Sequence, residues 1–213
     1  MASDAELLLA WQEGDERSGE ELFRRRVGEI SRFFRNKVAE PDVADAVSQT
    51  FLGLVGSRDR FRGETSFRRF LYAIANNVLR ELIRRRYKRE REELDFATLC
   101  VGQLSSHSPS SIIMRRREAQ AFVDALREVP LEDQILLEMR YVEAMGGREI
   151  AEAVGTTEAA VRGKLSRATE RLRKVVAEQL AMQEKGTVPD VRVEDLDAWA
   201  EEVRGHLGRE ESR

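Results

Sequence analysis

The sequence predicts an all-α protein made of two small helical domains. Charged residues make up 35% of the 213-residue chain, against 41% hydrophobic and 7% aromatic residues, with only four prolines. This balance is typical of surface-rich helices rather than of a sheet core. Along most of the chain apolar residues recur at spacings of three and four, which is the period of an amphipathic helix. The length allows two domains that each bury a modest core.

A nearly uncharged segment divides this helical pattern in two. Residues 94–113 collect Ser, Gly and Pro, the composition of a connector. We therefore expect a first domain over 1–93, a flexible linker over 94–113, a second domain over 114–185 and an acidic C-terminal helical extension over 186–213. Apolar linker residues such as Phe96 indicate that part of the linker docks, either on its own domains, which we favour, or in a groove of a partner.

In the first domain the apolar spacing predicts helices over 22–38, 43–55 and 67–82. Pro41 marks the break between the first two, because proline cannot continue a helix. A turn of Gly, Glu, Thr and Ser precedes the third, and its last residue, Ser66, is suited to cap that helix. These three helices are expected to form one domain.

Charge is distributed unevenly around a net value of −3. Residues 58–93 hold twelve basic and six acidic residues, and 162–174 hold six basic residues and one acidic residue. The two ends are acidic, with seven acids over 1–21 and ten over 175–213. Two basic islands predict two separate contacts with a polyanion. On charge alone, they are also compatible with ordinary solvated helix faces.

Residues 148–174 meet the requirements of a helix-turn-helix. Ala151 is small enough for a second helix to cross closely, and Gly155 suits the left-handed turn residue. The second helix turns basic side chains outward, so that Arg162 can reach guanine edges while Lys164 contacts phosphates. A plain helical hairpin is the alternative interpretation.

The sequence offers no catalytic or metal-binding constellation. The single Cys100 has no CxxC partner, and the only histidines, His107 and His206, lie in the linker and the extension. We expect no catalytic residues, no metal and no cofactor. The N-terminal segment lacks a basic region and a long apolar run, so we expect no membrane association and a reducing, cytoplasmic location.

Three segments resemble the sigma-70 family of bacterial RNA polymerase sigma factors, in its small extracytoplasmic-function (ECF) group. DAVSQTFLGLV (45–55) resembles the helix that binds core polymerase. FRGETSFRRFLYAIANNVLRELIRRR (61–86) resembles the segment that reads and melts the −10 element. Residues 125–174 resemble the four-helix region that reads the −35 element. The resemblance covers about residues 7–180 and implies a two-domain helical fold.

The resemblance, together with side-chain chemistry, assigns three sets of candidate residues. The −35 candidates are Arg148, Thr157, Arg162, Lys164, Arg167 and Arg171. The −10 candidates are Arg62, Thr65, Asn76, Asn77 and Arg80, whereas most aromatics beside them are expected in the core. The polymerase-binding candidates are Asp45, Gln49 and Phe51, expected on one side of a helix. Without the resemblance, that helix would be an ordinary amphipathic one.

The implied function is promoter recognition and transcription initiation, with bacterial RNA polymerase core enzyme and promoter DNA as partners. Whether a separate anti-sigma factor holds the chain inactive is left open. A stand-alone helix-turn-helix regulator is the main alternative, but it leaves the first domain without a role. The extension around Trp199 either folds back on a DNA-binding face as an inhibitor or completes the core of the second domain.

Overall fold

The computed structural model describes residues 2–63, 66–87, 95–96, 98–104, 117–184 and 190–210, and within them every regular element is a helix. The first half contains α1 (Asp4–Gln12), α2 (Glu16–Arg35), α3 (Glu40–Ser57), a 3-10 turn (Arg58–Arg60) and α4 (Phe67–Tyr87). The remainder contains α5 (Val101–Leu104), α6 (Arg117–Glu128), α7 (Leu131–Leu137), a π-helix (Glu138–Val142), α8 (Gly147–Val154), α9 (Glu158–Glu184) and α10 (Val193–Glu210). The predicted all-α fold class is confirmed.

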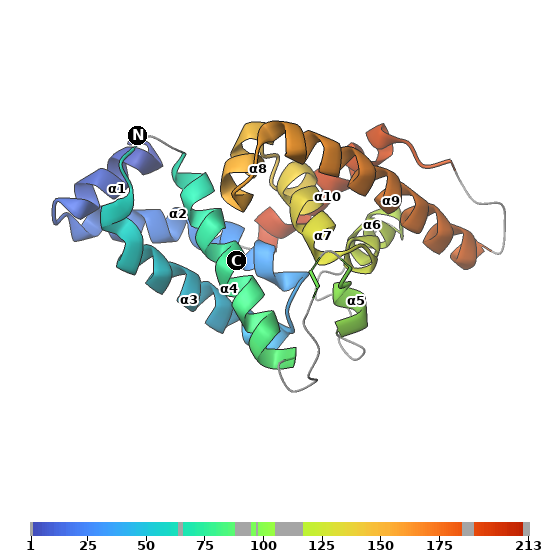
Figure 1. Cartoon of the computed structure of the whole chain (residues 1–213), viewed down its shortest axis with the longest axis horizontal. Helices are drawn as coiled ribbons and strands as arrows, with labels where there is room; N and C mark the ends of the chain where they lie inside the picture. Colours follow the sequence, from blue (N-terminus) through green and yellow to red (C-terminus); the bar gives the residue numbers. More distant parts are fainter. Residues whose placement is uncertain are drawn as a thin grey trace.

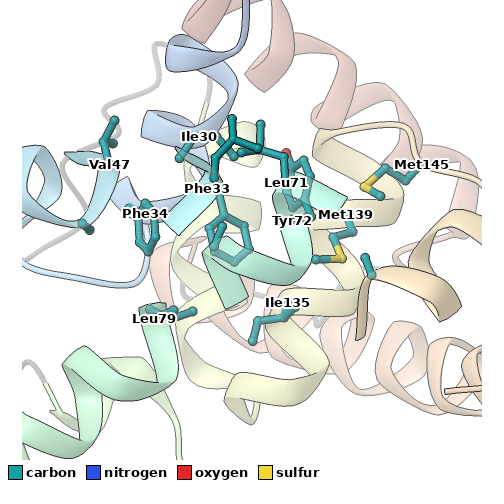
Figure 2. Packing of buried hydrophobic residues seen from close by; sticks show 14 of the residues in the cluster. Ile30, Phe33, Phe34, Val47, Leu71, Tyr72, Leu79, Ile135, Met139 and Met145 are labelled. Atoms are coloured by element: carbon teal, nitrogen blue, oxygen red, sulfur yellow. The ribbon is translucent and has the colours of Figure 1, made fainter. Parts of the chain in front are cut away.

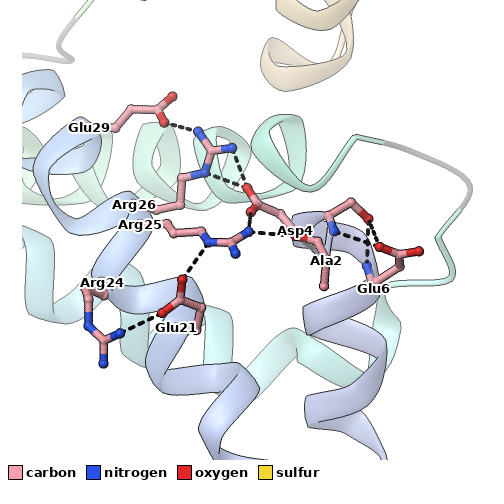
Figure 3. A network of polar contacts seen from close by, with 9 residues as sticks. Ala2, Asp4, Glu6, Glu21, Arg24, Arg25, Arg26 and Glu29 are labelled. Carbon is pink, nitrogen blue, oxygen red and sulfur yellow. Dashed lines mark hydrogen bonds and ion pairs between the residues drawn. The ribbon is translucent and has the colours of Figure 1, made fainter.

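The start of the chain is fixed by polar contacts that Figure 3 shows. The Ser3 hydroxyl accepts a hydrogen bond from the Glu6 amide at 3.3 Å, while the Glu6 carboxylate accepts one from the Ser3 amide at 2.7 Å. This reciprocal arrangement caps α1. Arg26 on α2 donates to Asp4 at 2.6 Å, and Arg25 reaches the same carboxylate at 3.2 Å. The acidic start of α1 is therefore held against α2.

The three helices expected in the first domain are present, and α3 packs against both α2 and α4. Pro41 lies in the first turn of α3, where a missing N–H costs no hydrogen bond. The domain core is built around large side chains that are almost completely buried, among them Phe33, Phe34 and Tyr72. Phe33 meets both other rings edge to face, at centroid distances of 5.2 and 5.4 Å.

The two halves of the chain pack against each other, as Figure 1 shows, with α4 lying beside α8. One hydrophobic cluster runs across the boundary: Ile135, Met139 and Met145 of the second half join the core of the first half (Figure 2). The local patterns that predict two domains contain no information on this contact, because a helical period identifies an apolar face but not its partner.

Part of the expected linker docks on the domains, as predicted. Phe96, Cys100 and Val101 are buried, and Cys100 forms an isolated bridge with Pro130. The Leu131 amide donates to the Leu99 carbonyl at 2.7 Å. This hydrogen bond links the start of α7 to the segment that follows the first domain.

The C-terminal helix α10 completes the core of the second half. Leu196, Ala200 and Val203 are buried among side chains of α6 and α9. Arg204 donates to the Tyr141 carbonyl, and Arg173 on α9 donates to the Val191 carbonyl just before α10. Of the two alternatives for the extension, this geometry favours the capping helix over a fold-back inhibitor.

Over the part of the chain that the structure describes, no helix combines the length and the apolar character needed to span a membrane.

Candidate nucleic-acid interface

The helix-turn-helix has the predicted geometry. Gly155 ends α8 in the left-handed region at φ 75°, where a side chain would be strained. The Thr156 amide donates to the Ala151 carbonyl at 2.8 Å, closing the turn. The Thr157 hydroxyl accepts a hydrogen bond from the Ala160 amide at 3.2 Å and so caps α9. Ala151 and Val161 are buried where the two helices cross.

Three of the −35 candidates have side chains that are exposed to solvent. The side chain of Arg162 is 79% exposed on the second turn of α9 and makes only a loose 3.7 Å contact with Glu158 of its own helix. Arg148 is also exposed and pairs with Glu152 of α8 at 3.1 Å. Arg167 is exposed one turn after Lys164. Arg162 and Arg167 are thus exposed on α9, and Arg148 is exposed on α8.

Two further −35 candidates are bound to acids of α7. Lys164 lies 3.3 Å from Glu132, and Arg171 forms an ion pair with Asp133. Burial opposes ionisation of Glu132, but hydrogen bonds from Arg80 and Lys164 outweigh it, and the pKa of this carboxyl is lowered. Each of the two basic side chains is therefore paired with an acid of α7, although about half of it stays exposed.

The −10 candidates divide into exposed and sequestered side chains. Arg62 and Asn77 are exposed, while Thr65 lies outside the described residues. Asn76 is 7% exposed, and its Oδ1 atom has no hydrogen-bond partner. Arg80 pairs with Glu132 at 3.2 Å and lies over the Phe96 ring at 5.0 Å.

One cavity of about 80 Å³ brings candidates from both sets together. It is lined by Asn76 and Arg80 from α4 and by Glu132 and Lys164 from the second half. Glu132, which is not among the predicted site residues, accepts a hydrogen bond from both basic side chains. No local signal marks it, because an acid in the first turn of a helix has an ordinary role at the helix dipole.

The aromatic side chains of the basic segment belong mostly to the core, as expected. Phe61, Phe67 and Tyr72 are buried, and Phe61 contacts the Phe67 ring at a centroid distance of 6.4 Å. Burial raises the pKa of Tyr72 well above its ordinary value. These rings hold α4 in place and are not available to stack on bases in this arrangement.

The polymerase-binding candidates need one correction. Asp45 is exposed and accepts a hydrogen bond from Gln49 at 2.6 Å, but Phe51 is buried and packs edge to face on Phe23 at 4.7 Å. Successive helical residues are 100° apart, so Phe51 points away from the other two, whereas Leu52 follows Asp45 by seven residues and shares its face. Leu52 is 70% exposed.

Two other exposed apolar side chains, Val55 on α3 and Phe23 on α2, accompany Leu52. We call Phe23, Asp45, Gln49, Leu52 and Val55 the α2–α3 surface. Its mixture of apolar side chains with a charge and an amide is typical of a protein-binding patch. Phe51 supports this surface from beneath.

Among the residues that the structure describes, no group of three or more His, Cys, Asp or Glu side chains is arranged to hold a metal ion. Burial raises the pKa of the Cys100 thiol, which disfavours the reactive thiolate form.

Two family models match the chain. The model described as Sigma-70 region 2 matches residues 22–89, and the model described as Sigma-70, region 4 matches residues 119–172. The first match spans α2 to α4, and the second runs from α6 into α9. Both matched segments contain the basic candidates described above.

Curated relatives and solved structures that are similar to most of the chain are also sigma factors. The ECF RNA polymerase sigma-E factor of Haemophilus influenzae is 23% identical, over 80% of this chain and 93% of the relative. The RNA polymerase sigma factor CnrH of Cupriavidus metallidurans is 27% identical, over 79% and 93%. The structure of CnrH with the cytosolic domain of CnrY has a TM-score of 0.57 at 21% identity, over 86% of this chain and 99% of that one. The structure of RpoE with the anti-sigma factor NepR from Bartonella quintana has a TM-score of 0.56 at 15% identity, over 76% and 96%.

Proposed function

The chain belongs to the extracytoplasmic-function group of the sigma-70 family of RNA polymerase sigma factors, and on this premise we propose that it binds core polymerase, reads a two-part promoter and lets transcription start there. The observation that carries this proposal is the co-occurrence in one chain of a helix-turn-helix with an exposed Arg162 and a separate basic helical domain. A factor that contacts two promoter elements needs both.

The second domain is proposed to read the −35 element. The second turn of α9 carries Arg162, whose planar guanidinium can donate two hydrogen bonds to one guanine in the major groove. Arg148 and Arg167, both exposed, are proposed to contact the phosphates on either side. Thr157 positions the helix rather than the DNA, since its hydroxyl already caps α9.

The first domain is proposed to capture the opened −10 strand. Arg62 and Asn77 are exposed on the basic segment, and Arg80 follows Asn77 by three residues on α4. Basic side chains follow the backbone of single-stranded DNA, and amides can hydrogen-bond an unpaired base. Asn76 is buried in the wall of the cavity, so it can contact the −10 strand only when that cavity opens.

Core polymerase is proposed to dock on the α2–α3 surface, with Leu52 and Val55 as apolar anchors and Asp45 as the charged contact. The proposed division of the chain follows from these roles: residues 1–93 for core binding and the −10 element, 94–113 as connector, 114–185 for the −35 element and 186–213 as a stabilising extension. Supporting this division, the buried face of α10 packs on the second half alone.

Three further properties follow by relationship. The family consists of non-enzymatic DNA-binding initiation factors, so we propose that this chain has no catalytic activity of its own. Since two related factors have been solved with CnrY and with the anti-sigma factor NepR, we propose that an anti-sigma protein also regulates this one. We propose a cytoplasmic location, because that is where core polymerase acts.

Gel filtration of the purified chain with core polymerase tests the proposal against a stand-alone regulator. A sigma factor co-elutes with core polymerase in a one-to-one ratio and supports run-off transcription. A chain that binds duplex DNA as a dimer and never co-elutes with the polymerase would be the regulator instead.

A further inference from the structure

The end of α1 lies beside the 3-10 turn that leads into the proposed −10 segment. α1 contacts both this turn, Arg58–Arg60, and the start of the basic helix α4 that follows it. The family model for region 2 begins at residue 22, so α1 lies outside the matched residues. Its contacts with the turn are therefore a feature of this chain that the match does not cover.

The side chain of Gln12, the last residue of α1, bridges the two ends of the turn. Its Nε2 group donates a hydrogen bond to the Arg58 carbonyl and a second one, at 2.9 Å, to the Phe61 carbonyl. One nitrogen with two hydrogens thus binds two backbone oxygens that lie three residues apart. Among uncharged side chains, only glutamine and asparagine carry such an NH₂ group. Because both partners are acceptors, the amide must present its nitrogen rather than its oxygen to the turn.

Two aromatic contacts hold the same turn from either side. The Arg58 guanidinium lies over the Trp11 ring of α1, at 5.1 Å from its centre. Trp11 lies so close to Gly19 that a Cβ there would be 2.6 Å from the ring. At the other end, Phe61 is 4% exposed and contacts the Phe70 ring of α4 at a centroid distance of 5.6 Å. The turn is therefore anchored to α1 at its start and to α4 at its end.

The proposed DNA contact begins directly after this anchored turn. Arg62, one of the −10 candidates, follows Phe61 and is exposed. Gly63 then has φ 71°, in the left-handed region that favours glycine. An arginine side chain has many rotamers, so the direction in which it reaches depends on how firmly its backbone is held. The bridge from Gln12 ends on the carbonyl of the residue immediately before Arg62.

We propose that Gln12 is a positioning residue for promoter recognition, which fixes the backbone from which Arg62 reaches the −10 strand. This role rests on the proposed function, because it requires Arg62 to contact DNA. A site that adopts its binding geometry for only a fraction of the time binds more weakly by that fraction. Loss of the bridge should therefore weaken recognition of the −10 element and leave the −35 contact on α9 unchanged.

Binding of holoenzyme to −10 single strands and to −35 duplexes tests this role. Gln12→Met keeps the length of the side chain but removes both donors. It should lower the preference for the −10 sequence that the parent holoenzyme selects, over a scrambled sequence, by about tenfold. The affinity for the −35 duplex and the co-elution with core polymerase should not change. Ser18→Ala, which removes the hydrogen bond from Ser18 to Asp15 in the same domain, is the matched control and should keep the parent's −10 preference.

A double-variant cycle with Arg62 separates positioning from general stabilisation. Arg62→Ala should itself lower the −10 preference, and adding Gln12→Met to it should have almost no further effect, because Gln12 acts through Arg62. Two losses of preference that multiply in full would show that the two residues act independently, and would overturn the positioning role.

Circular dichroism identifies the variants that remain folded. If Gln12→Met does not fold, Gln12→Asn replaces it, since the amide is kept but is one methylene too short to bridge both carbonyls. A folded variant of either kind that keeps the parent's −10 preference would overturn the positioning role and leave the proposed function intact. A parent holoenzyme without any −10 preference would contradict the proposed function itself, and the positioning role with it.

Discussion

Arg162 and Lys164 lie two positions apart on α9 but have different surroundings. Arg162 is exposed without a partner outside its own helix, whereas Lys164 is paired with Glu132. We expect Arg162→Ala to relax discrimination at one −35 base pair by about 1–3 kcal/mol, because a bidentate contact to a base is lost. Lys164→Ala should lower the affinity for all −35 sequences by the same factor, since a contact with a phosphate carries no sequence information.

Binding of a −35 duplex library to holoenzyme measures both effects. Met182→Ala, 80% exposed on the same helix about 30 Å further along, is the control and should change neither affinity nor preference. An Arg162→Ala holoenzyme with an unaltered promoter preference would refute the assignment.

The stability of the contact between α4, α7 and α9 should depend on pH, because Glu132 on α7 accepts hydrogen bonds from the other two helices. Its pKa is lowered below 4.5 because hydrogen bonds from Arg80 and Lys164 outweigh the effect of burial. A carboxyl with a lowered folded pKa contributes stability above its ordinary pKa, and loses that contribution as the pH falls through the folded value. The difference in unfolding free energy between the parent chain and Glu132→Gln should therefore be constant above about pH 5 and shrink below pH 4.5. Urea titrations at several pH values measure it, and a difference that grows on acidification would contradict the role of this carboxylate.

Among the helices, α3 carries most of the surface on which core polymerase is proposed to dock. Leu52 is 70% exposed on the face that also carries Asp45. Leu52→Asp should reduce co-elution with core polymerase at least tenfold while leaving the unfolding transition unchanged, because it removes an apolar anchor without opening the core. Met182→Asp, 80% exposed near the end of α9, is the control. Full co-elution of the Leu52→Asp chain would remove α3 from the interface.

The extension helix α10 should contribute to the stability of the second half, because its apolar face lies in that core. Leu196 is completely buried in the second core, so Leu196→Ala should lower the free energy of unfolding by about 2–5 kcal/mol. Val193→Ala, at a partly exposed position of the same helix, should cost less than about 0.5 kcal/mol. Urea unfolding compares the two. Truncation after Lys185 should likewise destabilise the chain, and a truncated chain that is equally stable but more active would restore the inhibitory role for α10.

Much of this element structure could be predicted from the sequence. The apolar spacing marked α2, α3 and α4, and Gly155 marked the turn between α8 and α9, because a left-handed residue there needs a glycine. The face of α3 was predicted less well. Phe51 is close to Asp45 in the sequence, but it does not share its helical face. Because each residue turns the helix by 100°, Phe51 points into the core and Leu52 points to solvent on the face of Asp45.

At the scale of the whole molecule, the sequence carries little information on how the domains meet. Lys37 and Glu138 are separated by about a hundred residues and have no local feature that distinguishes them from surface charges. Their pairing depends on the juxtaposition of α2 with the π-helix, which follows from packing rather than from periodicity. For the same reason Glu132 and its two basic partners could be found only from the assembled structure.

The proposed role of the whole chain is to place both domains on the two elements of one promoter while bound to core polymerase, and so to direct where transcription begins. In vitro transcription with purified core polymerase over a promoter library tests it most directly. RNA should start at a defined position downstream of a shared pair of −35 and −10 sequences, with a yield that falls steeply as salt rises. Core polymerase that initiates no differently with the chain than without it would show that the chain is not a sigma factor.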